Sequence, residues 1–349
     1  LMLMKESKGF VCLPGGFGTL DEMFELLALQ QTGKAEPVPI VLLDEPGGTF
    51  WQGLARYVDE QLVRLGLVAP DDLDRVLITD SVDDAVAAVG PEHLATLIYT
   101  SGTTGRAKGV ELPHRCWTYL GAGAQGIGIL RSDDLQYLWL PLSHSFGKML
   151  AAVQLQVGFP SVVDGRIDKI VDNLAVVQPT FMAGPPRIFE KIHGKIVQTI
   201  REEGGLKGVL FSWAFGVSER VAQATAEGRA PGRFLALQNS LADRLVLAKI
   251  RARLGGRMRF MVSGSAALSP DVAAWFGLAG ITLIEGYGLT ETGGGACIGD
   301  PEMPVSGAVG PPLIGSELKI ADDGEILLRG PLVMRGNHHL PDATAEVLD

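Results

Sequence analysis

The run of residues 99–115 reads YTSGTTGRAKGVELPHR and brings hydroxyl groups, glycines and a lysine together within a short stretch. It follows an apolar segment, residues 94–99, that we predict to be a buried strand. Gly102, Gly105 and Gly109 would interrupt any periodic element, so the run itself is predicted to be a loop. Glycines let backbone N–H groups approach anionic oxygens, while hydroxyls and a lysine add donors and positive charge. The composition therefore predicts a loop that binds a triphosphate.

The candidate phosphate contacts are Thr100, Ser101, Gly102, Thr103, Thr104, Gly105 and Lys108. The loop does not follow the Walker A pattern, in which a lysine and a hydroxyl residue come directly after the second glycine. A polar surface loop without a ligand is the alternative interpretation. A second stretch favours phosphate binding, because residues 285–292 read EGYGLTET and also follow an apolar segment, residues 280–284.

Together the two stretches resemble the phosphate loop and the adenine- and metal-binding motif of the adenylate-forming acyl-CoA synthetases. Residues 179–192, PTFMAGPPRIFEKI, resemble the segment typical of long-chain members. The resemblance implies that a fatty acid carboxylate attacks the α-phosphate of ATP to give acyl-AMP, and that the thiol of coenzyme A then displaces AMP. It also implies Mg²⁺, because bringing two anions together requires that their charge be neutralised.

The same resemblance implies roles for single residues. Thr100 and Glu291 would meet the metal, and Thr103, Thr104 and Lys108 would hold the β- and γ-phosphates.

For the remainder of the nucleotide, Tyr287 would stack near the adenine and Thr290 would touch the α-phosphate. The other implied nucleotide contacts belong to the same motif or to the turn SGSAA at residues 263–267; they are Gly264, Ser265, Ala266, Glu285, Gly286 and Gly288.

Lys108 and His144 are the candidate catalytic residues of this region. His144 lies in YLWLPLSHSF, residues 137–146, which we predict to be a strand that ends at an exposed turn. The resemblance implies that His144 lines the acyl pocket. A purely structural histidine is an equally good interpretation from the sequence.

The first ninety residues carry a different motif. Residues 14–22, PGGFGTLDE, lead from a short strand at 9–13 into a helix, and a strand, glycine turn and helix N-terminus together form an anion site. Strands at 38–44 and 76–79 alternate with helices at 50–65 and 82–89, which predicts a parallel sheet with right-handed crossovers. The apolar face predicted for the first helix is Leu20, Met23, Phe24, Leu27 and Ala28.

The motif resembles that of the LOG (Lonely Guy) phosphoribohydrolases, which release a base from a nucleoside 5′-monophosphate. The resemblance covers about residues 1–89 and implies that Glu22 assists cleavage while the phosphate is held by Gly15, Gly16, Gly18 and Thr19. A generic Rossmann-like turn, with Glu22 as a carboxylate in the first helical turn, is the alternative. The family's catalytic arginine has no counterpart here, since only Lys5 and Lys8 are cationic before Gly15. We therefore expect a partial layer and no working hydrolase.

Further elements follow from periodicity. Pro186 is predicted to start a helix whose apolar stripe ends at Gly204–Gly205, and Ser269 to cap another helix. The pattern also predicts a helix at 241–254 and leaves 206–231 unassigned. Glycine-spaced strands are predicted at 259–262, 308–315, 316–320 and 326–329.

The predicted fold class is α/β. A partial Rossmann-like parallel sheet (1–89) precedes the truncated N-terminal α/β domain of an acyl-CoA synthetase (90–305) and a small truncated β subdomain (306–349). The chain begins at Leu1 and stops before the family's ribose-binding aspartate and C-terminal domain. We therefore expect a fragment with impaired activity. The change of pattern at 89–92 suggests a fused reading frame, and a non-catalytic nucleotide-binding fragment is a further alternative.

Composition narrows the function classes. The 349 residues carry a net charge of −10, which argues against a nucleic acid partner because phosphate backbones select basic surfaces. The three cysteines form no C-x-x-C pair, which fits a reducing, cytoplasmic compartment and argues against a zinc site. No apolar run is long enough to span a bilayer. Peripheral membrane contact and the oligomeric state are left open.

Overall fold

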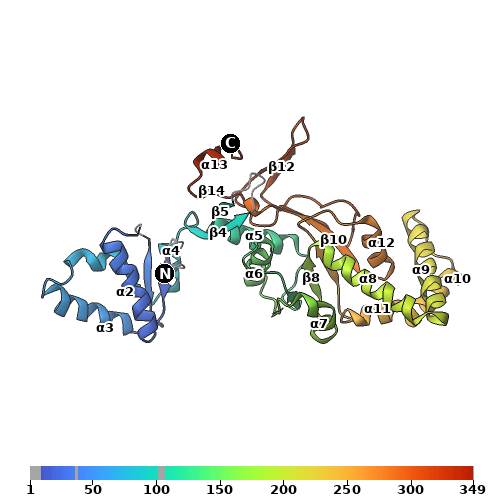
Figure 1. Ribbon diagram of the computed structural model, residues 1–349, viewed down its shortest axis with the longest axis horizontal. Coiled ribbons are helices and arrows are strands. Elements are labelled where there is room, and N and C mark those ends of the chain that lie inside the picture. Colours follow the sequence, from blue (N-terminus) through green and yellow to red (C-terminus); the bar gives the residue numbers. More distant parts are fainter. Residues whose placement is uncertain (1–8, 36–37, 101–106, 349) are drawn as a thin grey trace. The chain divides into compact units, whose positions relative to one another are not determined.

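The computed structural model describes residues 9–35, 38–100 and 107–348. The chain divides into two compact units (Figure 1). The first unit comprises residues 1–115 and 335–349, and the second comprises residues 116–334.

The first unit begins with a three-stranded parallel sheet in the order β1-β2-β3, with Phe10 opposite Ile40 and Ile40 opposite Val76. Helices connect the strands, as the alternating pattern predicts, so the expected parallel layer is confirmed. The elements are β1 (Phe10–Cys12), α2 (Phe17–Gln31), β2 (Ile40–Leu43), α3 (Phe50–Tyr57), the π-helix η1 (Val58–Val63), the 3-10 helix η2 (Pro70–Arg75), β3 (Val76–Thr79) and α4 (Val82–Ala88).

The buried face of α2 differs from the predicted one. Met23, Leu26 and Gln30 are buried, whereas Phe24 and Ala28 of the predicted face are exposed. The reason is a polar residue in the buried row: Gln30 Nε2 donates a hydrogen bond to the Val38 carbonyl at 3.2 Å. Apolar periodicity alone does not reveal a buried position that a satisfied glutamine fills.

A second, antiparallel sheet of the first unit has the order β14-β5-β4, formed by β4 (Leu94–Thr100), β5 (Lys108–Pro113) and β14 (Gly336–Asn337). The strand predicted at 94–99 is confirmed, although only Leu94 and Ile98 in it are buried. The loop prediction for Gly109 is wrong, because Gly109 lies in β5 opposite Tyr99. A Cβ on Gly109 would lie 3.2 Å from the Tyr99 ring, so this strand position favours a glycine. Helix α13 (Pro341–Ala345) follows β14.

The second unit contains a six-stranded sheet in the order β11-β10-β9-β8-β6-β7, parallel except for the pair β10–β11. Its strands are β6 (Gln136–Leu138), β7 (Ser161–Val163), β8 (Phe181–Gly184), β9 (Phe260–Ser263), β10 (Thr282–Tyr287) and β11 (Cys297–Ile298). All residues of β6, β8 and β9 are buried, as expected for central strands of a parallel sheet covered on both faces.

The helices of this region are α5 (His114–Ile127), α6 (Ser145–Val157), the 3-10 helix η3 (Ile167–Lys169), α7 (Ile170–Val177), α8 (Pro186–Glu203) and α12 (Pro270–Leu278). Pro186 starts α8 as predicted, and the predicted stripe is buried at Ile188, Phe189, Ile192 and Ile196. Ser269 is the N-cap residue of α12, but its side chain makes no capping hydrogen bond, so that detail of the prediction is wrong.

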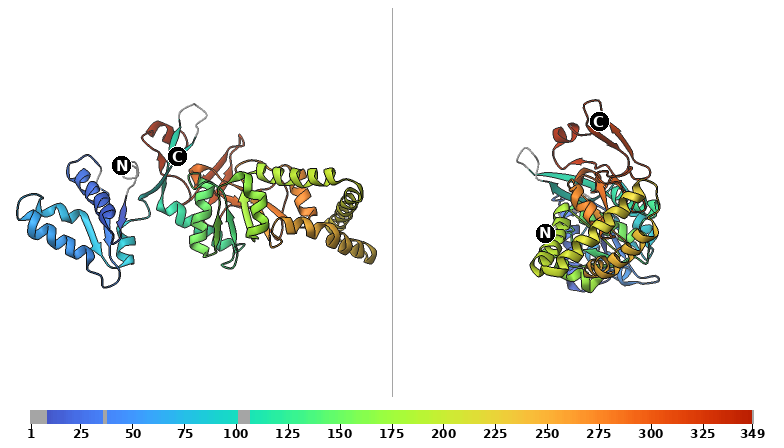
Figure 2. Two further views of the ribbon diagram at one scale, coloured as in Figure 1. Left: turned by 60° about the horizontal axis from the view of Figure 1, so that its bottom comes forward. Right: turned by 90° about the vertical axis from the view of Figure 1, so that its right-hand side faces the viewer.

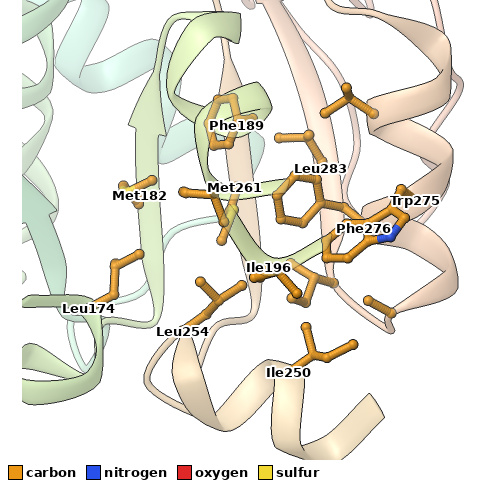
Figure 3. Close-up of a cluster of buried hydrophobic side chains, with 14 of the residues drawn as sticks. Leu174, Met182, Phe189, Ile196, Ile250, Leu254, Met261, Trp275, Phe276 and Leu283 are labelled. Atoms are coloured by element: carbon orange, nitrogen blue, oxygen red, sulfur yellow. The ribbon is translucent and has the colours of Figure 1, made fainter. Parts of the chain in front are cut away.

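The core of the second unit lies where α8, α12 and a further helix, α11 (Ala248–Arg253), cover the sheet. Figure 3 shows side chains from these helices meeting those of the central strands, among them Phe189, Met261 and Phe276. Phe189 and Phe276 contact edge to face, with ring centroids 6.2 Å apart.

Of residues 206–231, which the pattern left unassigned, residues 206–226 form most of a long helix, α9 (Gly205–Ala226). It packs beside a continuous helical segment made of α10 (Arg233–Ala242), the π-helix η4 (Asp243–Leu247) and α11 (Ala248–Arg253). The helix predicted at 241–254 is therefore real and begins earlier. Figures 1 and 2 show these helices in yellow, side by side at one end of the second unit.

The predicted hairpin after the sheet is present as β12 (Glu317–Ile320) and β13 (Ile326–Arg329). The strand predicted at 308–315 is wrong, because Gly310 has a φ of +78° and two prolines follow it. Only Pro312 of this segment forms a β-bridge, with Cys297. Among the described residues, no helix is both long enough and apolar enough to cross a membrane.

A buried carboxylate joins the amino ends of three neighbouring strands. Asp134, which precedes β6 and is 2% exposed, accepts hydrogen bonds at 2.6 Å from both Thr180 Oγ1 and Arg259 Nη1. Thr180 and Arg259 directly precede β8 and β9. Burial raises the pKa of the Asp134 carboxyl. Hydrogen bonds from Arg259, Thr180 and the Arg131 N–H lower the pKa by more, so it lies below its ordinary value.

We predict that Asp134→Asn lowers the free energy of unfolding by about 2–4 kcal/mol at pH 7, because it leaves the Arg259 charge without its partner. Urea unfolding measures this loss. Asp172→Asn is the matched control, since its pair with Lys195 is exposed on both sides and its loss is expected to cost under about 1 kcal/mol.

The lowered pKa also sets a pH dependence. The stabilisation is present above the unfolded pKa of about 3.9 and disappears as the pH falls through the folded pKa. The difference between wild type and Asp134→Asn should therefore shrink below about pH 4. A difference that stays constant from pH 7 to pH 3 would contradict the role of the charge.

Candidate functional site

The EGYGLTET stretch lies at the carboxyl end of β10, where ligands bind in open α/β sheets. The strand ends at Tyr287, and the chain returns after a 3-10 turn, η5 (Thr290–Thr292), to pair Tyr287 with Cys297 of β11. The motif is therefore a tight turn at the edge of the sheet, and not an extended surface loop.

Glycines make this turn possible. A Cβ on Gly288 would lie 2.5 Å from the carbonyl carbon of Gly294, so only glycine allows the two backbones to approach this closely. Gly294 has a φ of +96°, and a Cβ there would lie 2.8 Å from the backbone of Ser145. The turn is thus pressed against the first residues of α6. The sequence analysis missed Gly293, Gly294 and Gly295, although a GGG run directly after the motif is a usable signal.

The contact with α6 brings two hydroxyls together. Ser145, which is 2% exposed, has its Oγ 3.4 Å from Thr290 Oγ1. The adjacent His144 is exposed and is the N-cap of α6, with Nδ1 accepting a hydrogen bond from the Phe146 N–H at 3.3 Å. In the neutral ring Nε2 therefore carries the proton. His144 has at least a capping role, and it is not among the residues that line the cavity described below.

The two carboxylates of the motif have different surroundings. Glu285 accepts hydrogen bonds from the Leu268 N–H at 3.3 Å and from the Gly307 N–H at 3.0 Å, so it holds two loops in place. Glu291 is half-buried, and its carboxylate has no hydrogen bond or ion pair with any residue that the structure describes. Its backbone carbonyl accepts from the Met334 N–H at 2.8 Å. Glu291 is therefore the carboxylate of this turn that is available to a cation.

The predicted adenine-binding turn follows β9. Gly264 is buried, and its N–H donates to the Gly184 carbonyl at 3.1 Å. Ser265 has a φ of +69°, a conformation uncommon for residues other than glycine, and both Ser265 and Ala266 are exposed. The turn therefore presents backbone groups and small side chains, which suits contact with a flat ligand.

A cavity opens beside these two turns. Gly264, Ser265, Gly286, Tyr287 and Gly288 form part of its wall. The rest of the wall is aliphatic or aromatic and comes from α5, α6 and the strands; it includes Leu120, Ala124, Leu150, Phe181, Phe260 and Ile298. Among the described residues, no charged side chain lines the cavity. The arrangement suits an apolar chain whose polar end lies near the turns.

The first predicted motif lies on the first unit. Thr100 ends β4 and Lys108 begins β5, and the two are paired across the hairpin, with Thr100 Oγ1 donating to the Lys108 carbonyl at 3.5 Å. The two ends of the predicted phosphate loop are therefore paired strand residues. Its other predicted contacts, Ser101, Gly102, Thr103, Thr104 and Gly105, lie outside the described residues.

The same hairpin carries a charged cluster on β5. Glu111 accepts hydrogen bonds from Arg335 at 2.6 Å and contacts Nδ1 of His338 at 2.7 Å. Burial raises the pKa of Glu111, but the hydrogen bonds with His338 and Arg335 lower it by more. The cluster holds the segment around β14 against β5.

The glycine motif of the first unit lies between β1 and α2, as expected for an anion-binding turn. Gly16 is the N-cap of α2, and a Cβ on Gly15 would overlap the Thr19 side chain. Gly18 and Glu22 are exposed.

We predict that Gly288→Ala displaces the turn and lowers the free energy of unfolding, because the added Cβ would overlap the Gly294 backbone. Overpacking of this kind costs about 1–3 kcal/mol. Urea unfolding measures this loss. Gly277→Ala in α12 is the matched control, since a Cβ there meets no atom within 4 Å. An equal free energy of unfolding for the two variants would contradict the steric constraint between Gly288 and Gly294.

Comparisons with known proteins identify the family. The profile described as AMP-binding enzyme matches residues 25–337. The long-chain-fatty-acid–CoA ligase FadD15 of Mycobacterium bovis is 37% identical over 298 residues, which cover 82% of this chain and 48% of that protein. Fatty acyl-CoA synthetase A of Dictyostelium discoideum is 32% identical over 316 residues, which cover 84% of this chain and 44% of that protein. The chain thus spans about half the length of the curated relatives that it matches.

Solved structures support the fold. The N-terminal domain of FACL13 from Mycobacterium tuberculosis superposes with a TM-score of 0.53 at 15% identity, covering 99% of this chain and 81% of that one. The o-succinylbenzoate coenzyme A synthetase (MenE) from Bacillus subtilis in complex with AMP also superposes with a TM-score of 0.53, at 18% identity. This match covers 99% of this chain and 64% of that one.

The family match begins at residue 25 and continues through residues 89–92, where the sequence suggested a change of family. The LOG resemblance of residues 1–89 and the suggested fusion gain no support from these matches. The chain belongs to the family of AMP-binding enzymes.

Proposed function

We propose that this chain carries the nucleotide- and acyl-binding part of a long-chain fatty acid–CoA ligase. The observation that carries the proposal is the apolar cavity that opens directly beside the turns at Gly264–Ala266 and Gly286–Gly288. Relatives from bacteria, a slime mould and a plant are named as long-chain ligases or synthetases, which supports this choice of substrate.

The proposed reaction joins two anions. The fatty acid carboxylate attacks the α-phosphate of ATP, forming an acyl–phosphate bond and releasing pyrophosphate; the thiol of coenzyme A then takes the acyl group and releases AMP. In the first step the developing charge on phosphate must be neutralised. The role proposed for Lys108 is to supply positive charge to the phosphates, and the role proposed for Thr290 is to donate its hydroxyl to the α-phosphate.

The donor set of the turn suits Mg²⁺ bound to a nucleotide. Mg²⁺ takes one or two carboxylates together with phosphate oxygens and water. Glu291 offers a half-buried carboxylate without a described protein partner, whereas the Glu285 carboxylate is already occupied by two backbone donors. We therefore assign Glu291 to the metal and Glu285 to positioning. The assignment of Thr100 to the metal stays a prediction.

The acyl chain is proposed to occupy the cavity. Its wall offers aliphatic and aromatic side chains, while Ser265 and Tyr287 supply the hydroxyls. Burying methylene groups there contributes about 0.8 kcal/mol each. The missing side chains of Gly264, Gly286 and Gly288 leave room for the carboxylate and the nucleotide to meet.

Residues 1–89 are proposed to serve as a Rossmann-like layer without hydrolase activity. Base release from a nucleoside monophosphate rests on the PGGFGTLDE motif alone, and no further observation favours it. The division into 1–89, 90–305 and 306–349, like a cytoplasmic location, stays a prediction.

The proposal predicts palmitate-dependent exchange of labelled pyrophosphate into ATP in the presence of Mg²⁺. Ala124→Trp should lower the exchange with palmitate about tenfold or more, because the indole fills the cavity, and should affect hexanoate much less. Ala87→Trp on exposed α4 is the control. Exchange that needs no fatty acid, or an equal loss for both acids, would contradict acyl binding in this cavity.

Glu291→Gln should weaken ATP binding by about 1–3 kcal/mol with Mg²⁺ and leave it unchanged with EDTA, because only the metal-bound nucleotide needs the charge. Calorimetric titration under both conditions measures this difference. Glu317→Gln, on the exposed hairpin, is the control. An equal loss in both conditions would make Glu291 a structural residue, and no loss would make it a surface charge.

A further inference from the structure

The helical segment α10–η4 exposes a row of large apolar side chains. Phe234, Leu237, Leu241 and Leu245 are 73%, 69%, 49% and 38% exposed. Their spacing of three, four and four residues places them on one helical face, which we call the outer stripe. Leu206 and Val209 on the neighbouring helix α9 are also exposed, at 74% and 66%.

The outer stripe is separate from the face that builds the core. Ala242 and Leu247 of the same helical segment are buried, as is Ile250 of the adjoining α11, and these residues belong to the core cluster with α8 and α12. The folding of the unit therefore uses the inner face, and the outer stripe adds exposed apolar surface that folding does not require. Contiguous apolar surface of this kind marks an interaction site.

The charge of these helices differs from that of the chain. Residues 205–253 contain eight Lys and Arg and three Asp and Glu, a net charge of +5, in a chain whose net charge is −10. The positive charge is therefore concentrated on the one segment that also exposes the outer stripe.

Several of these cations are uncompensated. Lys207 pairs with Glu203 at 3.1 Å and Arg251 with Asp243 at 2.7 Å. In contrast, Arg233, Arg244, Lys249 and Arg253 form no ion pair with any residue in the described part of the chain, and all four are exposed. They flank the outer stripe on α10, η4 and α11.

We propose that the α9–α10–η4 surface docks on an anionic lipid bilayer, with the outer stripe entering the headgroup boundary and the flanking cations contacting lipid phosphates. A helix with an apolar row and unpaired Lys and Arg lies in the interface plane in this way. Nucleic acid would use the cations but not the apolar row, and a second copy of this surface would bring two +5 segments together. Docking needs neither ATP nor fatty acid, so it is tested separately from adenylation.

The experiment measures co-sedimentation of the 349-residue protein with two kinds of vesicle, each at low and at high salt. One kind is phosphatidylcholine alone, and the other contains about 30% phosphatidylglycerol, which is anionic. We expect binding to the anionic vesicles, at least about tenfold weaker binding to the neutral ones, and weaker but measurable binding at high salt, because salt screens exposed charges and leaves the apolar contact.

Two variants separate the contributions. Arg244→Gln, Lys249→Gln and Arg253→Gln combined should weaken binding about 100-fold, since each cation near an anionic surface contributes about fivefold. Phe234→Ser with Leu237→Ser should abolish binding that survives high salt. The matched controls are Lys319→Gln with Arg329→Gln on the β12–β13 hairpin, and Leu155→Ser with Val176→Ser, which change equally exposed residues. All changed residues are exposed, and an unchanged melting temperature verifies the fold.

Three results would overturn the proposal. One is the absence of binding to anionic vesicles. Another is equal binding by the charge variant and its control. The third is a concentration-dependent dimer, seen by sedimentation velocity without vesicles and abolished by Phe234→Ser, in a protein that does not bind lipid; this would assign the surface to a second copy of the chain.

Discussion

The approach of two backbones at Gly288 and Gly294 is the constraint on which the candidate site depends. It folds the EGYGLTET stretch back onto the start of α6, places Thr290 beside Ser145, and leaves the cavity open next to Gly286 and Gly288. No side chain larger than hydrogen fits at Gly288 or Gly294 without moving the backbone. The geometry of the candidate site therefore depends more on the absence of side chains at these glycines than on its polar residues.

A second constraint is the hydrogen-bonded cluster around Asp134 at the amino ends of the central strands. Asp134, Thr180 and Arg259 join the starts of β6, β8 and β9, so the relative heights of these strands are fixed at their amino ends. The turns that form the candidate site lie at the carboxyl ends of β9 and β10. Short parallel strands transmit this alignment with little freedom, because their residues are buried on both faces.

Much of the fold follows from apolar periodicity and glycine or proline boundaries. The strands β1, β2 and β3, the helices α3, α4 and α8, and the β12–β13 hairpin lie close to their predicted positions. The errors have different causes: a hydrogen bond to the Val38 carbonyl accompanies the burial of Gln30, and pairing with Tyr99 places Gly109 in a strand. The positive φ of Gly310 and the two prolines after it interrupt the segment 308–315. For the candidate site, the sequence predicted the positions of the two turns. It did not distinguish the carboxylate of Glu285, which bonds two backbones, from that of Glu291, because only the folded chain brings Leu268 and Gly307 to Glu285.

The shared carboxylate at Glu285 has a consequence for the behaviour of the site. Its two oxygens hold the loop after β9 and the loop around Gly307 at the same time. A ligand that shifts one loop must stretch or release a bond to that carboxylate, and so changes the stability of the other loop. By linkage the effect runs equally in both directions. The stabilities of the two loops are therefore coupled, although roughly forty residues of sequence separate Leu268 from Gly307.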